Sequence, residues 1–446
     1  MDAVVLSVVE AEVSFMRDMS GMKEPRRRIC FYSIATHLGG AEKSLLDIVI
    51  GLEKSSQGRS QNCYEPWLLL PKEDGPLIEE LRARKIPFTV VPMPQTFLKL
   101  SRETPIKSLI LVVLALPGLS LYFLKLIAAL KSQNIRLFHT TGIKCHALST
   151  LFGLVFRVPV LWHLRDILRP GLTHWALRVL RAIGQVHVIA NSQATAEAFE
   201  LSSLKPVKSL KPLKSRSIEI FYNGLDPLVY RSIPNSKYRE HFKISAEVPV
   251  IGIMGVLARW KGQLEFLAMA RVLISNGIDA RFVLIGDQIY DTSGDRDFKE
   301  ILIAKVKELG LETFVHFSGF EKDVPQVLNG LDILVHASNR PEPFGRVIVE
   351  AMACQVPVVA SAAGGVLELI DDGKTGLLFK PGDVNSMAEA VKTLVKNPEL
   401  RSALKKNGYE NFLQRFTIEA HLSQLIQKYD RLLSGEVSGE GFGRKR

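Results

Sequence analysis

Two acidic residues and two glycines lie close together in the second half of the chain, in a pattern that could support chemistry. Glu342 and Glu350 are eight positions apart in EPFGRVIVE, and Gly364 and Gly365 follow the next apolar run. Prolines on both sides of Glu342 favour an extended loop, because proline fixes its own backbone and restricts the residue before it. A helix starting at Phe344 would point its free N–H groups at this loop. We therefore expect a polar or anionic ligand in front of the helix.

Glu350 should lie inside that helix, about two turns from its start. The sequence around it is apolar, with VIV before the glutamate and AMA after it, which predicts a buried carboxylate. A buried carboxylate must be paired or hydrogen-bonded, and vicinal sugar hydroxyls are suitable donors. Gly364 and Gly365 should bring a second stretch of backbone to the same point.

Two other segments with glycines follow predicted strands. In THLGGAEKSLLDIVIGL, Gly39 and Gly40 could let the backbone approach an anion at a helix start, although a plain tight turn explains them too. In GVLARWKG, Arg259 and Lys261 flank a tryptophan. They could hold a phosphate through charge-assisted contacts or simply form a surface pair. Neither segment has the G-x-G-x-x-G spacing of a dinucleotide site, so we expect no nicotinamide cofactor.

The composition is that of a globular protein of two or three domains. The chain has 446 residues, of which 47% are hydrophobic and 23% charged, which excludes collagen-like, coiled-coil and disordered classes. Its four cysteines include no CxxC pair, which favours a reducing cytosol over a disulfide framework. The net charge of +11 indicates an anionic partner, which could be a phosphate-bearing substrate, a membrane surface or nucleic acid. The first 22 residues contain acids and do not resemble a secretory signal.

Short β-rich runs alternate with helical patterns along nearly the whole chain, which is typical of parallel sheets covered by helices. The first half has predicted strands at 28–34, 65–71, 88–93, 135–141, 159–166 and 186–192. The second half repeats the pattern at 248–256, 280–287, 315–320, 332–338, 356–361 and 375–380. We therefore predict an α/β protein with two doubly wound, Rossmann-like domains that face each other across a cleft. Ligands of such sheets bind at the carboxyl ends of the strands.

Two internal segments and the chain ends bear on membrane contact and disorder. LILVVLALPGLSLYF, 109–123, is shorter than a membrane span and is interrupted by Pro117 and Gly118, so it should be a core helix or a helix resting on a membrane face. SLKPVKSLKPLKSR, 203–216, has five basic residues and no acid. It should be an exposed loop, either simply solvated or in contact with phosphate or membrane. We expect residues 1–24 to be a flexible extension and 435–446 a disordered tail.

Together these motifs resemble the retaining glycosyltransferases of family 4, which have the GT-B fold. The resemblance runs from residue 28 to about residue 430. The family's E-x7-E signature matches Glu342 and Glu350, and its glycine-rich acceptor loop matches Gly39 and Gly40. Further matches, in family order, are NGLD at 223–226, IGD at 285–287, VHFSGF at 315–320 and the strand that contains LDILVHAS.

The resemblance implies that a nucleotide-sugar donor binds to the second domain. Glu350 would contact the ribose, Lys261 the pyrophosphate and Glu342 the donor sugar. Backbone N–H groups at the start of the helix would bind the sugar or the phosphate. The implied catalytic residues are Glu342, Lys261 and Arg259, and the implied donor-binding residues are Glu350, Phe344, Gly345, Arg346, Gly255 and Gly286.

The resemblance places the acceptor on the first domain, at Gly39, Gly40, Arg165 and His163. Two departures from the family pattern change the expected contacts. Val256 takes the usual arginine position in GVLARWKG, so Arg259 would supply that charge instead. Arg165 stands where many members have a histidine, and His163 lies two residues earlier. Arg165 could pair with Asp166 or hold an anionic acceptor or a donor phosphate.

The implied domain limits are 25–222 for the acceptor domain and 223–415 for the donor domain, with a helix at 416–434 that crosses back to the first domain. The implied enzyme transfers a hexosyl or related sugar, with retention of configuration, to a glycan, a lipid-linked acceptor or another acceptor. It would need no cofactor, no metal and no nucleic acid. Its expected place is the cytosol, and the charge leaves open a peripheral position on an anionic membrane surface, the inner face of the plasma membrane.

Other functions fit the sequence less well. DRD at 295–297 looks like the D-x-D of metal-dependent glycosyltransferases, but it lies in a polar loop outside that fold context. A GT-B-like nucleotide-sugar epimerase would use similar domains, whereas a phosphorylase needs a pyridoxal lysine motif that the sequence lacks. A non-enzymatic polyanion or membrane binder would explain the charge but would leave the glutamate pair unexplained.

Overall fold

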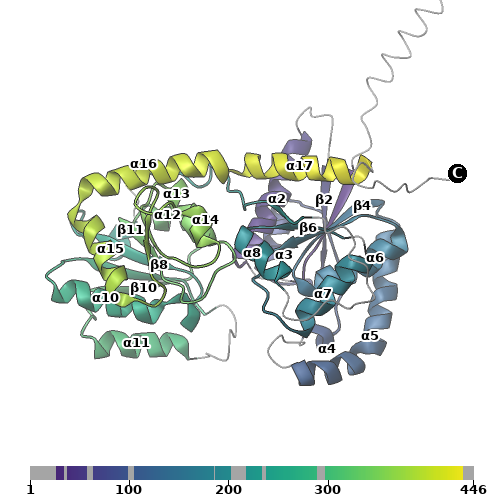
Figure 1. Ribbon diagram of the computed structural model, residues 1–446, viewed down its shortest axis with the longest axis horizontal. Helices are drawn as coiled ribbons and strands as arrows, with labels where there is room; N and C mark the ends of the chain where they lie inside the picture. The colour runs from purple at the N-terminus through teal and green to yellow at the C-terminus, as the bar shows by residue number, and fades with distance from the viewer. Residues whose placement is uncertain are drawn as a thin grey trace, which may run out of the picture.

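The protein is described by a computed structural model that covers residues 27–34, 38–57, 64–98, 105–184, 186–201, 217–233, 238–288 and 297–434, with the side chains of 56–57, 96–97 and 105–117 left out. The predicted extension and tail, the basic segment 203–216 and most of DRD lie outside the described residues. Two parallel sheets with helices on both faces make up the two halves of the molecule (Figure 1). The predicted α/β class with two doubly wound sheets is confirmed.

The first sheet has seven parallel strands in the order β3-β2-β1-β4-β5-β6-β7. Its strands are largely apolar because helices cover both faces. The strands are β1 Arg27–Tyr32, β2 Tyr64–Leu70, β3 Phe88–Val90, β4 Ile135–Thr141, β5 Val160–Leu164, β6 His187–Ala190 and β7 Glu219–Ile220. Strand β7 is missing from the predicted set, since two residues are too few to show a strand pattern.

Helices α2, α3 and α17 pack on one face of the first sheet, and α5, α6, α7 and α8 pack on the other. The helices of this half are α2 Gly40–Gln57, α3 Pro76–Ala83, α4 Gln95–Leu98, α5 Pro105–Lys131, α6 Ile143–Phe156, α7 Leu172–Ile183 and α8 Gln193–Glu200.

Helix α5 corrects one expectation, because it continues through Pro117 and Gly118 for 27 residues. Proline removes one hydrogen bond and costs about 3 kcal/mol inside a helix. Tyr122, Leu126 and Leu130 of α5 are buried in the core of the first domain, and this packing offsets the cost. Among the described residues, no helix combines the length and the hydropathy that a membrane span needs.

The second sheet has six parallel strands in the order β10-β9-β8-β11-β12-β13. They are β8 Val250–Met254, β9 Arg281–Ile285, β10 Val315–Gly319, β11 Ile333–His336, β12 Val358–Ser361 and β13 Leu377–Phe379. Helices α10, α11 and α15 cover one face, and α12, α13 and α14 cover the other. The helical elements are α9 Tyr238–His241, the 3₁₀ turn η1 Arg259–Lys261, α10 Gln263–Ser275, α11 Phe298–Glu308, α12 Val324–Leu328, α13 Arg346–Ala353, α14 Val366–Leu369, α15 Val384–Lys396 and α16 Pro398–Arg415.

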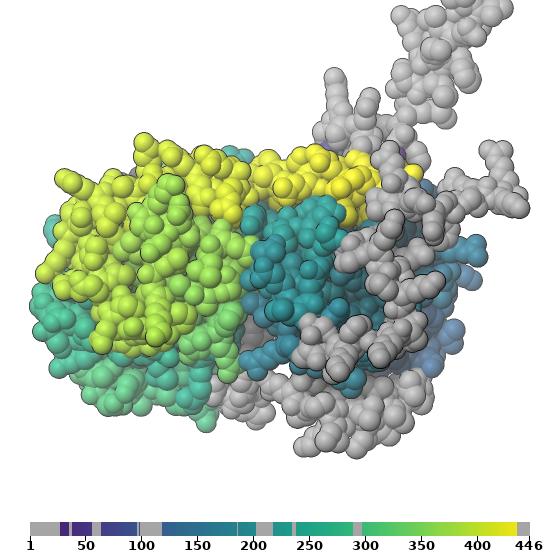
Figure 2. All heavy atoms as spheres, in the orientation of Figure 1, coloured from purple at the N-terminus to yellow at the C-terminus, as the bar shows by residue number. Residues whose placement is uncertain are grey.

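The chain crosses between the two halves twice, and the two crossings touch each other. Helix α17, Ile418–Ser434, follows α16 and lies on the first sheet, so the two yellow helices span the molecule in Figures 1 and 2. Leu225 donates its backbone N–H to Phe416 and accepts one from Ile418, at 2.9 and 2.8 Å. A Cβ on Gly224 would lie 2.5 Å from the carbonyl oxygen of Thr417. Only glycine fits there, which explains the glycine of NGLD.

Candidate active site

Glu342 lies between β11 and α13, at the carboxyl end of the second sheet. Its backbone forms an isolated parallel bridge with Gly364, and the N–H of Gly365 donates to its carbonyl oxygen at 2.8 Å. Gly364 has φ +63°, and a Cβ there would lie 2.4 Å from that oxygen. The two glycines therefore let the loop after β12 hold the loop of Glu342 in place.

The Glu342 carboxylate is buried, with 7% of the residue exposed, and is surrounded by donors. Its Oε1 accepts hydrogen bonds from the Lys261 ammonium, from the Ser338 hydroxyl and from His336 Nε2, the last at 3.0 Å. Burial alone would raise the pKa of Glu342, but Lys261 and His336 outweigh burial and hold the pKa far below its usual range. Glu342 is thus a carboxylate that stays ionised inside the protein.

Lys261 and Arg259 come from the same turn but point to different places. Lys261 Nζ lies beside Glu342 and 4.2 Å from the centre of the Trp260 ring. Arg259 is exposed, and its guanidinium lies 5.4 Å from the ring centre of Phe298 on α11. The structure therefore brings Lys261, but not the Arg259 side chain, to the carboxylate.

Glycines set the path of the loops around Lys261. Gly262 has φ +79°, and a Cβ there would be 2.0 Å from the carbonyl oxygen of Ala337. Gly286 has φ +131°, and a Cβ there would be 1.9 Å from the carbonyl oxygen of Gly255. These contacts pack the loops after β8, β9 and β11 against one another, so Gly255 and Gly286 support the site through their backbones.

Glu350 is buried in α13, as its apolar neighbours predict, but it lies nearer the start of the helix than expected. The helix begins at Arg346, so Glu350 is its fifth residue, little more than one turn in. The reason is that Gly345 adopts a left-handed conformation, with φ 96°, and stays outside the helix. Glu350 Oε1 accepts hydrogen bonds from Arg346 Nε at 2.7 Å and from the Tyr230 hydroxyl at 3.2 Å. This carboxylate therefore already has protein donors.

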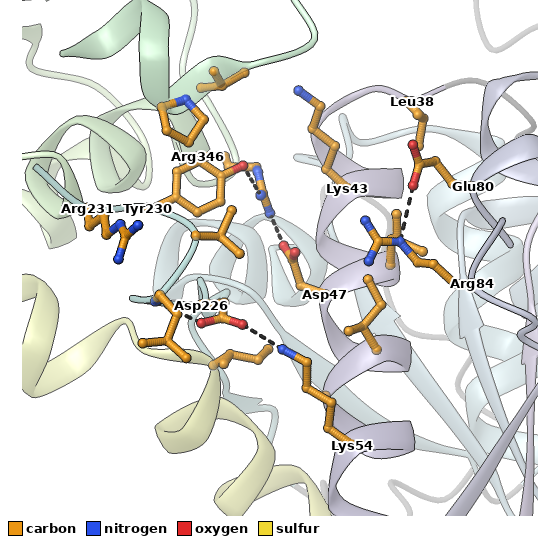
Figure 3. Close-up of a pocket in the computed structure, with 18 of the residues that line it drawn as sticks. Leu38, Lys43, Asp47, Lys54, Glu80, Arg84, Asp226, Tyr230, Arg231 and Arg346 are labelled. Carbon is orange, nitrogen blue, oxygen red and sulfur yellow. Dashed lines mark hydrogen bonds and ion pairs between the residues drawn. The ribbon is translucent and has the colours of Figure 1, made fainter. Parts of the chain in front are cut away.

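Arg346 links the two domains. Its Nη1 donates to Asp47 Oδ2 at 2.6 Å and to Ser44 Oγ at 3.1 Å, both on α2 of the first domain. Figure 3 shows the guanidinium between Asp47 and Tyr230. Burial alone would lower the pKa of Arg346, but Asp47 outweighs it and the pKa is raised.

The glycine loop of the first domain faces this link. Gly39 precedes α2 and Gly40 is its first residue, and a Cβ on Gly40 would lie 4.0 Å from Arg346 Cδ. Gly345, at the start of α13, lies on the other side of Arg346. The Phe344 side chain is buried away from this point, with its ring 6.1 Å from that of Phe416.

Arg165 and His163 lie in a buried polar cluster under α17. Arg165 follows β5 and donates to the carbonyl oxygen of Ala41 at 2.5 Å. Burial lowers the pKa of its guanidinium to about 10. His163 is fully buried and contacts His139 at 3.2 Å and His421 by ring stacking. The His163 side chain is therefore covered by its own domain, between the sheet and α17, and its role on the acceptor side stays a prediction.

A cavity of about 1290 Å³ lies next to these groups, between the two domains. Asp47, Tyr230 and Arg346 lie on its wall (Figure 3), whereas Lys261, Glu342 and Glu350 are not among its lining residues. The rest of the wall comes from α2, α3, α17 and the loops at 226–233 and 320–325. The Arg346 link therefore separates this cavity from the two glutamates.

Comparison with known proteins identifies the second domain. Residues 235–411 match the model of the family described as glycosyl transferases group 1. These residues belong to that family. Both glutamates, Lys261 and the α13 helix start lie within the matched range, so the second-domain part of the site belongs to the region that matches this family.

Two curated relatives and one solved structure extend the likeness. N-acetyl-alpha-D-glucosaminyl L-malate synthase of Bacillus anthracis is 28% identical over 51% of this chain and 57% of its own length. 2-deoxystreptamine glucosyltransferase of Streptomyces kanamyceticus is 28% identical over 60% and 64%. The chain thus spans about half to two thirds of the length of these two relatives. The crystal structure of HepE from Anabaena with UDP and glucose matches with a TM-score of 0.73 and 27% identity over 91% of this chain and all of that one. The part of the chain that the structure describes has the GT-B fold.

Four side chains of the site described here are missing from the sequence-based set: His336, Ser338, Asp47 and Tyr230. His336 and Ser338 lie two positions apart at the end of β11, so both point to the same side of the chain, a signal that the sequence does contain. Asp47 lies seven residues after Gly40, two helical turns along the same face. Tyr230 gives no such signal, because it lies on a separate loop, 120 residues before Glu350 in the sequence.

Proposed function

We propose that the protein is a retaining, metal-independent glycosyltransferase that uses a UDP-sugar. The observation that carries the proposal is the likeness to HepE, whose crystal structures contain UDP-glucose or UDP with glucose, over 90% or more of this chain. The ionised Glu342 beside Lys261 supports it, since this is the charge arrangement that a donor sugar and a pyrophosphate would meet. Domain 223–415 would bind the donor, and domain 25–222 would bind the acceptor.

The charges near Glu342 suggest how the reaction is assisted. When the bond between the anomeric carbon and the phosphate oxygen breaks, negative charge grows on UDP and positive charge grows on the sugar ring. Lys261 and the N–H groups at the start of α13 would stabilise the phosphate, and Glu342 would stabilise the ring. The acceptor hydroxyl would approach from the same face as the leaving phosphate, give its proton to the phosphate oxygen that departs with UDP, and form the new bond to the anomeric carbon, which gives retention. No nucleophilic side chain is needed.

Donor binding would rearrange the Arg346 link. If the ribose hydroxyls donate to Glu350, they replace or join the present donors, Arg346 and Tyr230. Gly39, Gly40 and Arg165, across the cleft, would then meet the acceptor, which is a glycan, a lipid-linked glycan or another hydroxyl compound. We place the enzyme in the cytosol, an assignment that fits three free, buried cysteines, Cys30, Cys145 and Cys354.

A nucleotide-sugar panel tests the proposal. We expect UDP, and not GDP or ADP, to raise the melting temperature, and a UDP-sugar to be slowly hydrolysed in the absence of acceptor. Glu342→Gln should bind UDP but release far less sugar. If heparin stabilises the protein and no nucleotide does, the chain is a polyanion binder and the proposal is wrong.

A further inference from the structure

Positive charge is concentrated in one part of the first domain. Residues 104–196 contain ten Lys and Arg residues and a single acidic residue, Asp166, so this part contributes a net charge of +9 to the chain's +11. The segment includes α5, α6 and α7, the outer helices on one face of the first sheet. Much of the chain's positive charge therefore lies in the segment that contains these three helices, although one of its basic residues, Arg165, is buried.

Exposed apolar side chains gather on the same three helices. Among the described residues, eight of the fifteen large apolar side chains that are exposed lie on α5, α6 and α7. We call this set the α5–α7 face: Leu121, Leu124, Leu151, Leu154, Val155, Leu172, Trp175 and Ile183. Scattered exposed apolar residues are ordinary, but a concentration on neighbouring elements indicates an interaction surface.

The side chains of this face point away from the protein core. On α7, Leu172, Trp175 and Ile183 share one side of the helix, while His174 and Leu177 are buried on the other. Helices α5 and α6 lie against each other, since the rings of Phe123 and Phe152 stack with centres 4.6 Å apart. The three outward stripes therefore cover the outer side of one continuous helix layer.

Six exposed basic residues lie on or next to these helices in the sequence: Lys125, Lys131, Arg136, Arg157, Arg169 and Arg178. Lysine and arginine can lay their apolar stems along a hydrophobic surface while the charged ends reach a polar layer. Tryptophan favours the boundary between lipid and water, and Trp175 is 38% exposed. A protein partner usually presents charges of both signs, whereas an anionic bilayer presents one sign over a wide area. We propose that the α5–α7 face binds the surface of an anionic lipid bilayer, with its apolar side chains among the headgroups.

The orientation of the layer suggests why such binding would be useful. Arg169 and α7 follow β5, so they come from the carboxyl end of the sheet, where ligands of this fold bind. A bilayer on this face would bring lipid-linked acceptors to the rim of the cleft. This last step rests on the proposed function, while the membrane binding itself does not.

Vesicle sedimentation tests the surface directly. Wild-type protein should bind vesicles of phosphatidylcholine with 30% phosphatidylglycerol, should bind pure phosphatidylcholine roughly tenfold or more weakly, and should weaken with salt. Arg169→Glu with Arg178→Glu, and separately Leu172→Ser with Trp175→Ser, should each reduce binding to the anionic vesicles by roughly tenfold or more. The matched controls are Lys405→Glu with Lys406→Glu and Ile303→Ser with Leu413→Ser, exposed residues of the second domain that should not change binding.

A fluorescence measurement checks that the face itself touches lipid. Trp175 is the most exposed of the described tryptophans. Lipids with a quencher near the headgroup should reduce the emission of the wild type, and Trp175→Phe should lose most of this quenching while still sedimenting with vesicles. An unchanged far-UV circular dichroism spectrum and an unchanged melting temperature in every variant show that the fold is intact, whether or not the protein binds UDP.

Three outcomes would overturn the inference. One is that anionic vesicles do not bind the wild type. The second is that both face variants bind like the controls, while replacing the lysines of 203–216 removes binding, because the basic segment and not the face would then be the membrane contact. The third is a dimer, seen by sedimentation equilibrium, that the face variants dissolve, since the face would then join two copies of the chain. Membrane binding without glycosyl transfer would leave this inference standing and contradict only the proposed function.

Discussion

Glu342 and Arg165 are buried charges at the carboxyl ends of the two sheets, yet their surroundings differ. Three donors converge on one oxygen of Glu342, and a full positive charge lies beside it. Arg165 donates to a backbone carbonyl and contacts His163, while Glu42 and Asp47 provide the nearby negative charge. Its Nε, together with Nε2 of His163 and of His421, has no hydrogen-bond partner among the described residues. The charge of Glu342 in the second domain is therefore balanced by its partners, whereas the charge of Arg165 in the first domain is only partly balanced.

This difference indicates which side of the cleft already has its binding groups in place before substrate binds. A compensated carboxylate needs little rearrangement, so the donor side can be preorganised in the free protein. Buried polar atoms without partners cost about 1–3 kcal/mol each. The first-domain cluster has three such atoms, whereas among the partners of Glu342 only His336 has one, at Nδ1. We therefore expect the first-domain cluster to be the more sensitive side to added charge. Arg346 joins the two sides, because it contacts Glu350 on one and Asp47 on the other.

Breaking that connection should have the largest effect on stability. Arg346→Leu leaves two carboxylates, Asp47 and Glu350, without their cationic partner. Removal of one partner of a buried ion pair costs about 3–5 kcal/mol, so we expect a loss of this size in urea denaturation. Asp47→Asn should cost less, and the double variant should cost less than the sum of the single ones. Arg84→Leu, which breaks an exposed pair with Glu80 on α3, is the control.

Arg346→Leu with wild-type stability would contradict the link, and the two domains would then be held by α17, the chain crossings and the remaining contacts, such as those of Glu368 with the N–H groups of Gln193 and Ala194. Small-angle X-ray scattering gives an independent measure. The variant should be more extended than the wild type in the absence of nucleotide, whereas Arg84→Leu should not.

Glu342→Gln tests the compensated side through catalysis. The amide keeps the shape but removes the charge that would face the developing positive charge on the sugar. We expect kcat to fall by about 10²–10³-fold with little change in KM, as for other preorganised electrostatic groups. Glu350→Gln should instead raise KM for the donor. Near-normal kcat in a folded Glu342→Gln protein, judged by circular dichroism, would remove this carboxylate from the reacting centre.

Lys261 and Arg259, which lie on the same 3₁₀ turn, provide a sharper comparison on the donor side. Lys261→Met should weaken UDP binding by about 10- to 100-fold, because a charge-assisted hydrogen bond contributes about 1.5–3 kcal/mol. Arg259→Met should change it by less than about threefold, since that guanidinium lies over Phe298 and an exposed charge contributes less than about 1 kcal/mol. Calorimetry with UDP and with uridine measures both. Equal losses for UDP and uridine would exclude a phosphate contact of Lys261.

Much of the fold could be predicted from the sequence, because parallel strands buried on both faces form continuous apolar runs. Strand β4 has the predicted limits, 135–141, and most of the other strands lie inside the predicted runs. Apolar runs extend past the last hydrogen-bonded residue, so β3 and β13 are shorter than expected. Helix α5 could not be predicted, since tertiary packing outweighs the local effect of Pro117.

The site was predictable in part for a similar reason. Spacing within one segment brings Glu342, Gly345 and Glu350 together, and it predicts that Glu350 is buried. Contacts between segments have no such signal: nothing local shows that Asp47 meets Arg346, 299 residues later, or that His163 lies under α17. Sequence patterns locate the charges of one loop, whereas the partners of those charges depend on how the two domains meet.

His421 tests the less compensated side with the smallest expected effect. Its Nδ1 lies 2.7 Å from the Tyr222 carbonyl oxygen, and its ring stacks on His163. Burial lowers the pKa of His421 from 6.5 to about 4, with Arg165 adding to the decrease and the carbonyl opposing it. Burial also lowers the pKa values of His139 and His163. All three histidines are therefore neutral in the folded protein near pH 7.

The sign of the pH effect follows from the order of protonation. Above pH 6.5, His421 is neutral in the folded and the unfolded chain and adds no pH dependence. Between 6.5 and about 4 the unfolded chain takes up the proton first, so stability decreases as the pH is lowered, by up to about 1.4 kcal/mol per pH unit for each such histidine.

His421→Asn keeps a donor for the Tyr222 carbonyl but cannot titrate. The midpoint of urea unfolding, measured at pH 7.0, 6.0 and 5.0, should therefore decrease less in the variant than in the wild type. The difference should match the contribution of one histidine. Glu342 also lowers stability near the acid end of this range, because its pKa is lowered in the folded protein and its carboxyl titrates near 4.5 in the unfolded chain. This effect is the same in the variant and the wild type, so the comparison isolates His421. If the variant loses stability as steeply as the wild type, His421 is not the buried neutral base that its contacts indicate, and the contrast between the two sides of the cleft would rest on Arg165 alone.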